Sequence, residues 1–122
     1  MQKITLILGG ARSGKSAYGE MLALKNFSSP IYIFTAQAWD DEMKSRIEIH
    51  RKRREGKNWK DIEAPIELGM AIKNNATSNN CILVDCLTLW LTNILLAEQD
   101  IDDAINELLQ TIKACPGEII LI

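Results

Sequence analysis

The 122-residue chain alternates between short apolar runs and longer stretches whose apolar residues recur every three or four positions. The runs predict strands and the periodic stretches predict helices, in the alternating order typical of α/β proteins. Predicted strands cover residues 4–8, 31–34, 59–63, 81–85 and 118–122. Predicted helices cover residues 15–24, 41–54 and 87–97, with one more placing Pro65 in its first turn and another opening at Asp102-Asp103. The first strand is nearly continuously apolar, as expected of a parallel strand covered on both faces.

Length and composition favour one ordinary globular domain, residues 1–122. Hydrophobic residues make up 47% of the chain and charged residues 25%, and the net charge of −2 gives no reason to expect nucleic acid as a partner. No apolar run approaches the length of a membrane span. The three cysteines show no C-x-x-C spacing. We therefore expect a reduced, cytoplasmic protein without disulfides or zinc.

A glycine-rich motif follows the first strand. Residues 9–16 read Gly-Gly-Ala-Arg-Ser-Gly-Lys-Ser and satisfy G-x-x-x-x-G-K-[ST] without a mismatch. Glycine lets backbone N–H groups approach phosphate oxygens closely, and the following helix adds the positive end of its dipole. Lys15 would reach the terminal phosphates and the Ser16 hydroxyl would bind Mg²⁺. The alternative is a glycine-rich turn that fits the pattern by chance, but its position between strand and helix favours a nucleoside triphosphate site.

A second motif is the strand 81–85, in which four apolar residues end in Asp85. This is the Walker-B pattern, which delivers a carboxylate to the sheet edge where Mg²⁺ would sit. Any strand can end in Asp, so the pattern alone is weak. The phosphate loop upstream favours the metal-binding interpretation.

The predicted helix 41–54 carries the only histidine, His50, next to the basic run Arg51-Lys52-Arg53-Arg54. A lone histidine is more often an ordinary surface or core residue, and a basic run is more often a solvated face. Together they predict more, because nearby cations lower the pKa of an imidazole and a neutral ring can attack phosphorus. The same arginines can bind phosphate oxygens. The cluster therefore suits nucleophilic attack on a phosphate.

The chain stops directly after the apolar run 118–122. In an α/β protein of this kind a strand leads to a loop at the active-site edge. The ending therefore predicts that the sequence is a fragment.

The motifs together resemble the bifunctional adenosylcobinamide kinase/adenosylcobinamide-phosphate guanylyltransferase family. The resemblance rests on residues 9–16, 32–37 (Tyr-Ile-Phe-Thr-Ala-Gln), 41–43, Arg46-Ile-x-x-His50-Arg51, Trp59-x-x-x-Glu63-Ala-Pro65 and 85–93. It covers the whole chain and implies a P-loop NTPase domain of the RecA-like type, commonly trimeric. Family members continue past residue 122, so the sheet is expected to be incomplete at the C-terminus.

The resemblance also implies two reactions in cobalamin biosynthesis. ATP or GTP phosphorylates adenosylcobinamide, and GMP is then transferred from GTP to the corrinoid phosphate through a guanylylated histidine, matched here by His50. Nucleotide-binding positions of the family fall on Gly9, Gly10, Ala11, Arg12, Ser13, Gly14, Lys15, Ser16, Phe34, Thr35, Ala36, Arg51, Lys52, Arg53, Arg54, Glu63 and Asp85. Ser16 and Asp85 are the expected Mg²⁺ ligands, although some members have glutamate at the Asp85 position.

Two other functions fit parts of the pattern. A plain P-loop kinase for another small hydroxylated substrate explains the phosphate loop but gives His50 no role. A nucleotide-dependent binding module would bind triphosphate without transferring any part of it.

Overall fold

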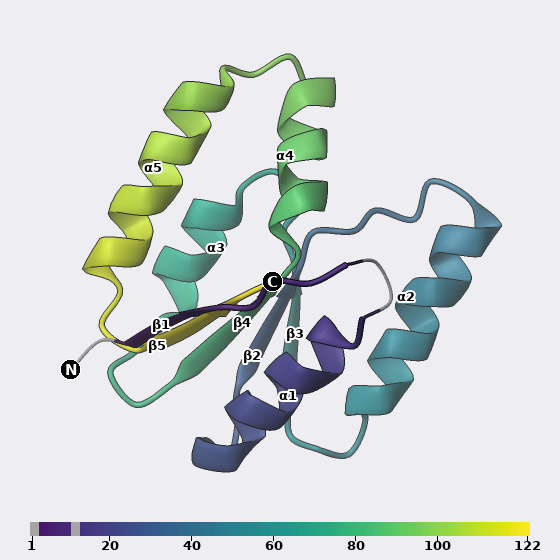
Figure 1. Cartoon of the computed structure of the whole chain (residues 1–122), viewed down its shortest axis with the longest axis vertical. Coiled ribbons are helices and arrows are strands. Elements are labelled where there is room, and N and C mark those ends of the chain that lie inside the picture. Colours follow the sequence, from purple (N-terminus) through teal and green to yellow (C-terminus); the bar gives the residue numbers. More distant parts are fainter. Residues whose placement is uncertain (1–2, 11–12) are drawn as a thin grey trace.

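A five-stranded, all-parallel sheet forms the centre of the molecule in a computed structural model that describes residues 3–10 and 13–122. The strands are β1 (Lys3–Leu6), β2 (Ile31–Phe34), β3 (Lys60–Glu63), β4 (Cys81–Asp85) and β5 (Glu118–Leu121), in the order β1-β5-β4-β2-β3 (Figure 1). The helices are α1 (Lys15–Asn26), α2 (Asp41–Arg54), α3 (Leu68–Asn75), α4 (Leu87–Leu96) and α5 (Ile101–Ala114). The α/β fold and the parallel sheet are as predicted.

The last strand lies inside the sheet, between β4 and β1. Ile119 of β5 is in register with Ile82 of β4 on one side and with Ile4 of β1 on the other. The terminal apolar run is therefore buried, because its main-chain groups pair with neighbours along both edges.

The expectation that β1 is covered on both faces is wrong. The insertion of β5 makes β1 an edge strand, and Ile4, Leu6 and Leu8 are about half exposed or more. A continuous apolar run predicts burial, but it cannot tell an interior strand from an edge strand with an exposed face.

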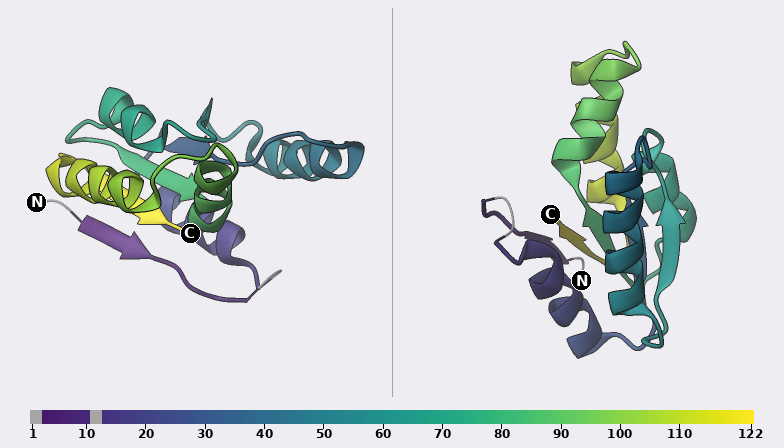
Figure 2. Two further views of the ribbon diagram at one scale, coloured as in Figure 1. Left: turned by 90° about the horizontal axis from the view of Figure 1, so that it is seen from above. Right: turned by 90° about the vertical axis from the view of Figure 1, so that its right-hand side faces the viewer.

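Two apolar layers cover the sheet, and alternate residues of each strand supply them. Ile82 and Val84 of β4 pack with residues of α3, α4 and α5 on one face. Leu83, between them, packs with Ala23 of α1 on the other face. Figure 2 shows the same arrangement, with α3 and α5 on one side of the sheet and α1 on the opposite side.

Helix α3 begins later than the proline signal predicts, at Leu68 rather than near Pro65. The carbonyls of Pro65 and Ile66 accept hydrogen bonds from the side chains of Asn93 and Trp90 on α4, each at 2.9 Å. Tertiary contacts with α4 thus hold this segment in a bend, so that it does not form a helical turn.

Helix α2 stands to one side of the layered body (Figures 1 and 2). Asp40 caps it by accepting a hydrogen bond from the backbone N–H of Met43 at 2.8 Å. Its only buried residue is Arg54, so no apolar stripe attaches it to the sheet. Polar contacts must therefore hold this helix in place, and they lie at the site described next.

Candidate nucleotide-binding site

The carboxyl ends of the parallel strands meet at one edge of the sheet, and a cavity of about 1630 Å³ opens there. Its walls come from the phosphate loop, the ends of β2 and β4, and the inward side of α2. The predicted site residues among them are Ser13, Gly14, Lys15, Ser16, Phe34, Ala36, His50, Arg51, Lys52, Arg53, Arg54, Glu63 and Asp85. Predicted site residues 72 positions apart in the chain thus share one cavity, since Ser13 and Asp85 both line it.

The described residues of the phosphate loop, 9, 10 and 13–16, include two glycines with conformational roles. Gly14 adopts a φ of 87°, in the left-handed region, immediately before α1 begins. A Cβ at Gly9 would lie 2.6 Å from Oγ of Ser13, so the loop closes tightly at that point. Nζ of Lys15 donates hydrogen bonds to the carbonyls of Gly9 and Gly10 at 3.0 and 2.6 Å. The ammonium group is therefore held over the loop, as a phosphate site requires.

Asp85 at the end of β4 contacts the first turn of α1. Oγ of Ser16 donates a 2.6 Å hydrogen bond to Oδ2 of Asp85, and the hydroxyl of Tyr32 donates to the same oxygen. Hydroxyl and carboxylate oxygens are the donors that Mg²⁺ prefers, with phosphates and waters completing its shell. The described residues contain no group of three or more His, Cys, Asp or Glu side chains that could hold a metal ion instead. Ser16 and Asp85 therefore fit a Mg²⁺ that is also bound by phosphates.

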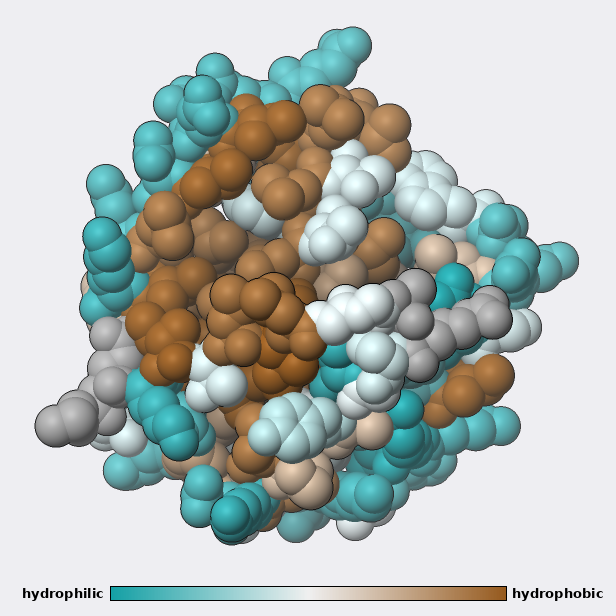
Figure 3. Space-filling model, in the orientation of Figure 1, coloured by the Kyte–Doolittle hydropathy of each residue, from teal (hydrophilic) through white to brown (hydrophobic). Residues whose placement is uncertain are grey.

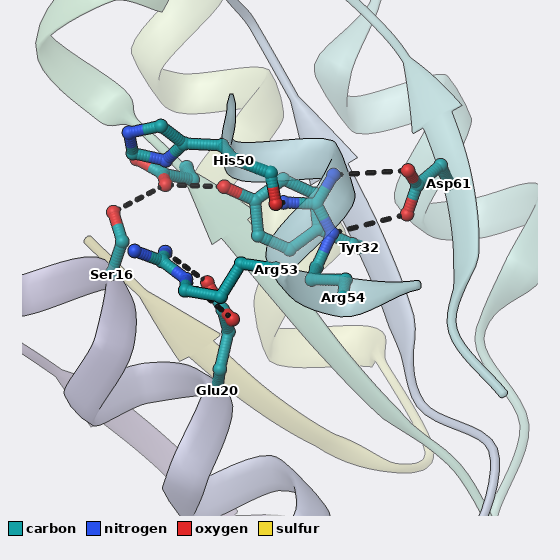
Figure 4. A network of polar contacts seen from close by, with 8 residues as sticks. Ser16, Glu20, Tyr32, His50, Arg53, Arg54 and Asp61 are labelled. Atoms are coloured by element: carbon teal, nitrogen blue, oxygen red, sulfur yellow. Dashed lines mark hydrogen bonds and ion pairs between the residues drawn. The ribbon is translucent and has the colours of Figure 1, made fainter. Parts of the chain in front are cut away.

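His50 lies on the last turns of α2, partly buried, and lines the same cavity as Lys15. Figure 4 shows its imidazole on the side of the polar network where Ser16 lies. Burial lowers the pKa of His50 below its usual value, and the positive charge of Arg53 lowers that pKa further. The ring is therefore biased toward its neutral, nucleophilic form.

Two neighbouring arginines attach α2 to the rest of the fold (Figure 4). Arg53 binds both carboxylate oxygens of the buried Glu20 on α1, at 3.1 and 2.5 Å. Arg54, only 4% exposed, binds both carboxylate oxygens of Asp61 on β3, at 3.3 and 2.9 Å. Bidentate pairs of this kind fix orientation as well as distance. They set the position of His50 over the cavity.

The structure does not bring every predicted nucleotide contact into the cavity. Thr35 is completely buried, and its hydroxyl donates to the carbonyl of Cys86 at 2.7 Å and accepts from the N–H of Cys86 at 3.0 Å. Its side chain therefore joins the ends of β2 and β4, and Thr35 is not among the residues that line the cavity, so its contact with nucleotide stays a prediction. Gly9 and Gly10 contact Lys15 through their backbone carbonyls. Ala11 and Arg12 lie outside the described residues.

The sequence analysis did not identify the residues that bind and orient the predicted site residues. Glu20 and Asp61 are the carboxylates that bind the two arginines, and Tyr32 binds Asp85. The one available signal was a tyrosine within the otherwise apolar run 31–34, because a buried phenol usually needs a hydrogen-bond partner. Nothing in the spacing of Glu20 or Asp61 pointed to an arginine.

Known proteins resemble this chain over nearly its whole length. The model of the family described as cobinamide kinase / cobinamide phosphate guanyltransferase matches residues 5–122. A bifunctional adenosylcobalamin biosynthesis protein, CobP, from Pseudomonas aeruginosa is 48% identical over 119 residues, which are 96% of this chain and 68% of that protein. The Escherichia coli protein CobU, with the same description, is 34% identical over 132 residues, covering 96% of this chain and 72% of its own length.

The match to the family model extends over nearly the whole chain and includes the phosphate loop, the His50 helix and Asp85. The relatives are longer, and the chain spans about seven tenths of each. With the shared cavity at the carboxyl edge of a parallel sheet, these findings lead to one conclusion. The chain belongs to the cobinamide kinase / cobinamide phosphate guanyltransferase family.

Proposed function

We propose that this chain binds GTP or ATP in the cavity, phosphorylates adenosylcobinamide, and transfers GMP to the corrinoid phosphate through His50. The observation that carries the proposal is that His50 and the phosphate-loop residues Lys15 and Ser16 line one cavity. The names of the relatives support the two activities and the place in cobalamin biosynthesis.

In the kinase step the triphosphate would lie along the loop from Ser13 to Ser16, with the acceptor hydroxyl attacking the γ-phosphorus. The bond between the γ-phosphorus and the β–γ bridging oxygen breaks, and the hydroxyl proton leaves to solvent. Lys15 would offset the charge that develops on the phosphate oxygens. Ser16 and Asp85 would hold Mg²⁺, which supplies further charge stabilisation when bound.

In the transfer step the neutral imidazole of His50 would attack the α-phosphorus of GTP. A phosphorus–nitrogen bond forms, and the bond to the pyrophosphate leaving group breaks. The phosphate of the corrinoid then attacks the same phosphorus and releases His50. The lowered pKa of His50 supports this role, because it keeps the attacking lone pair available near neutral pH.

A test uses GTP labelled at the α-phosphate. The wild-type chain is expected to gain a covalent label that survives alkali and is released by acid, as phosphorus bound to an imidazole nitrogen would be. His50→Ala should bind GTP but take up no label, and Lys15→Ala should lose triphosphate binding.

The outcomes separate the candidate functions. Transfer of the γ-phosphate to adenosylcobinamide without labelling of His50 would leave a kinase and overturn guanylyl transfer. Bound nucleotide without transfer of either group would favour a binding module. Unchanged GTP affinity in Lys15→Ala would contradict the phosphate-loop assignment itself.

The proposal includes a cytoplasmic location and assembly of several copies. Free thiols at all three cysteines support a reducing compartment. Exposed apolar side chains on β1 and α4 support contacts between copies. Among the described residues, no helix has both the length and the apolar character that a bilayer crossing requires.

A further inference from the structure

Tyr32 on β2 packs in the apolar cluster that includes Ala23 and Leu83, borders the candidate site and is only 3% exposed. Its hydroxyl donates a hydrogen bond to Oδ2 of Asp85. The ring of Trp59 meets the ring of Tyr32 edge-on, with centroids 5.8 Å apart and planes at 88°. The phenol is therefore fixed by packing on its ring and by the carboxylate at its hydroxyl. Figure 4 shows the hydrogen bond from the Tyr32 hydroxyl and Arg54 over the Tyr32 ring.

Both donors to Asp85 use the same carboxylate oxygen. Ser16 and Tyr32 donate to Oδ2, and Oδ1 has no hydrogen-bond partner among the residues that the structure describes. Two fixed donors on one oxygen determine the rotation of the carboxylate. The carboxylate of Asp85, which lines the cavity, is therefore held in one orientation.

The face of the Tyr32 ring contacts α2, the helix that carries His50. The guanidinium carbon of Arg54 lies 3.5 Å from the centre of the Tyr32 ring, a cation–π contact. The same guanidinium donates a 3.0 Å hydrogen bond to the backbone carbonyl of His50. A single side chain thus lies between Asp85 at the sheet edge and the last turn of α2.

We propose that Tyr32 is a positioning residue for the nucleotide site. Its hydroxyl orients the Asp85 carboxylate that would hold the metal ion, and its ring supports Arg54 and, through it, the turn that bears His50. The inference rests on the proposed function and deepens it, because it names what aligns the carboxylate with the nucleophile. Groups that orient metal ligands in this way commonly change metal affinity strongly when removed.

The test measures binding of labelled GTP by equilibrium dialysis, in EDTA and across a series of Mg²⁺ concentrations. Tyr32→Phe removes only the hydroxyl, so GTP binding in EDTA should be unchanged. The Mg²⁺ concentration that gives half the enhancement of GTP binding should rise about tenfold. Tyr18→Phe makes the same change at an exposed tyrosine on α1 and should leave both quantities unchanged.

A double-mutant cycle separates positioning from general loosening of the fold. If Tyr32 acts through Asp85, then Tyr32→Phe should have no further effect on the Mg²⁺ dependence in an Asp85→Asn background. Tyr32→Leu, which also removes the ring, should speed amide hydrogen exchange in residues 50–54. Tyr32→Phe should keep the wild-type exchange rates there.

If Tyr32→Phe shows the same Mg²⁺ dependence of GTP binding as the wild type, the inference is overturned. It is also overturned if Tyr32→Phe weakens GTP binding in EDTA as much as in Mg²⁺. Additive effects of Tyr32→Phe and Asp85→Asn would also overturn it. The proposed guanylyl transfer fails on a different result, namely Mg²⁺-dependent GTP binding by the wild type without any label on His50. The two failures are therefore distinguishable.

Discussion

Neighbouring residues of the basic run 51–54 have different surroundings, although the sequence presents them as one cluster. Arg53 is bound to Glu20 and Arg54 to Asp61, whereas the side chain of Arg51 is 69% exposed in a loose pair with Glu48. Successive residues of a helix point about 100° apart, so adjacent arginines reach different elements. Two of the four cations therefore hold the helix in place, Arg54 from a buried position and Arg53 from a partly exposed one, whereas Arg51 and Lys52 are exposed.

The charge next to His50 can be tested by NMR, because a single histidine needs no assignment. Arg53→Gln should raise the pKa of His50, since it removes a nearby cation and leaves the carboxylate of Glu20 without that partner. Because the pKa of His50 is lowered in the folded protein, the protein loses stability as the pH falls below the pKa that His50 has in the unfolded chain. Arg53→Gln should therefore also lessen this loss of stability at low pH.

The measurement is the pH titration of the imidazole proton resonances. Lys52→Gln removes an equal charge from an exposed position next to Arg53 and should change the pKa of His50 less. A lower pKa of His50 in Arg53→Gln would show that the arginine does not act on the ring through its charge.

At the scale of elements, helix α1 approaches the sheet closely at Gly19, where there is no side chain. A Cβ at Gly19 would lie 2.9 Å from Cδ1 of Leu83 and 3.3 Å from Cδ1 of Ile122. This close approach lets the helix that follows the phosphate loop pack directly on β4 and on the residue after β5. Ser16 belongs to α1 and Asp85 ends β4, so the distance between them depends on how closely α1 packs on β4 at Gly19.

Gly19→Ala should lower the free energy of unfolding by about 1–3 kcal/mol, because the added methyl group overpacks the contact with Leu83. Gly69→Ala on α3 is a matched control, since its Cβ would meet only Thr111 at an ordinary 3.5 Å. That substitution should be neutral or stabilise by up to about 1 kcal/mol through the higher helix propensity of alanine. Urea unfolding measures both, and an equal effect of the two would contradict the packing argument.

The whole molecule has an extended apolar surface. Figure 3 shows apolar side chains gathered over the region that β1, α4 and α5 occupy in Figure 1. Exposed members on β1, just after it and on α4 are Ile4, Leu6, Leu8, Leu95 and Leu96, with Leu8 81% and Leu96 67% exposed. Contiguous exposed apolar surface of this kind favours association.

We expect the chain to self-associate as its concentration rises, and Leu96→Lys should weaken that association by placing a charge within the apolar surface. Sedimentation velocity over a concentration series measures the effect. Ile49→Lys introduces the same charge at an exposed position on α2, away from this surface, and should change association little. Similar sedimentation of all three proteins across the series would rule out this surface as the cause.

The sequence by itself determined the elements of the fold and the chemistry of its motifs. Local signals sufficed for the phosphate loop, for Asp85 at the end of an apolar strand and for a histidine among arginines, because each motif is contiguous. Helix boundaries were less certain, since contacts with α4 replaced the expected first turn of α3.

Only the tertiary structure decided which distant residues meet. The order of the strands puts β5 inside the sheet and β1 at its edge, and no local pattern specifies that order. The pairing of Arg53 with Glu20 and the contact of Tyr32 with Asp85 join segments 33 and 53 residues apart. Such contacts depend on the path of the whole chain, which is why the groups that orient His50 and Asp85 could not be identified from spacing alone.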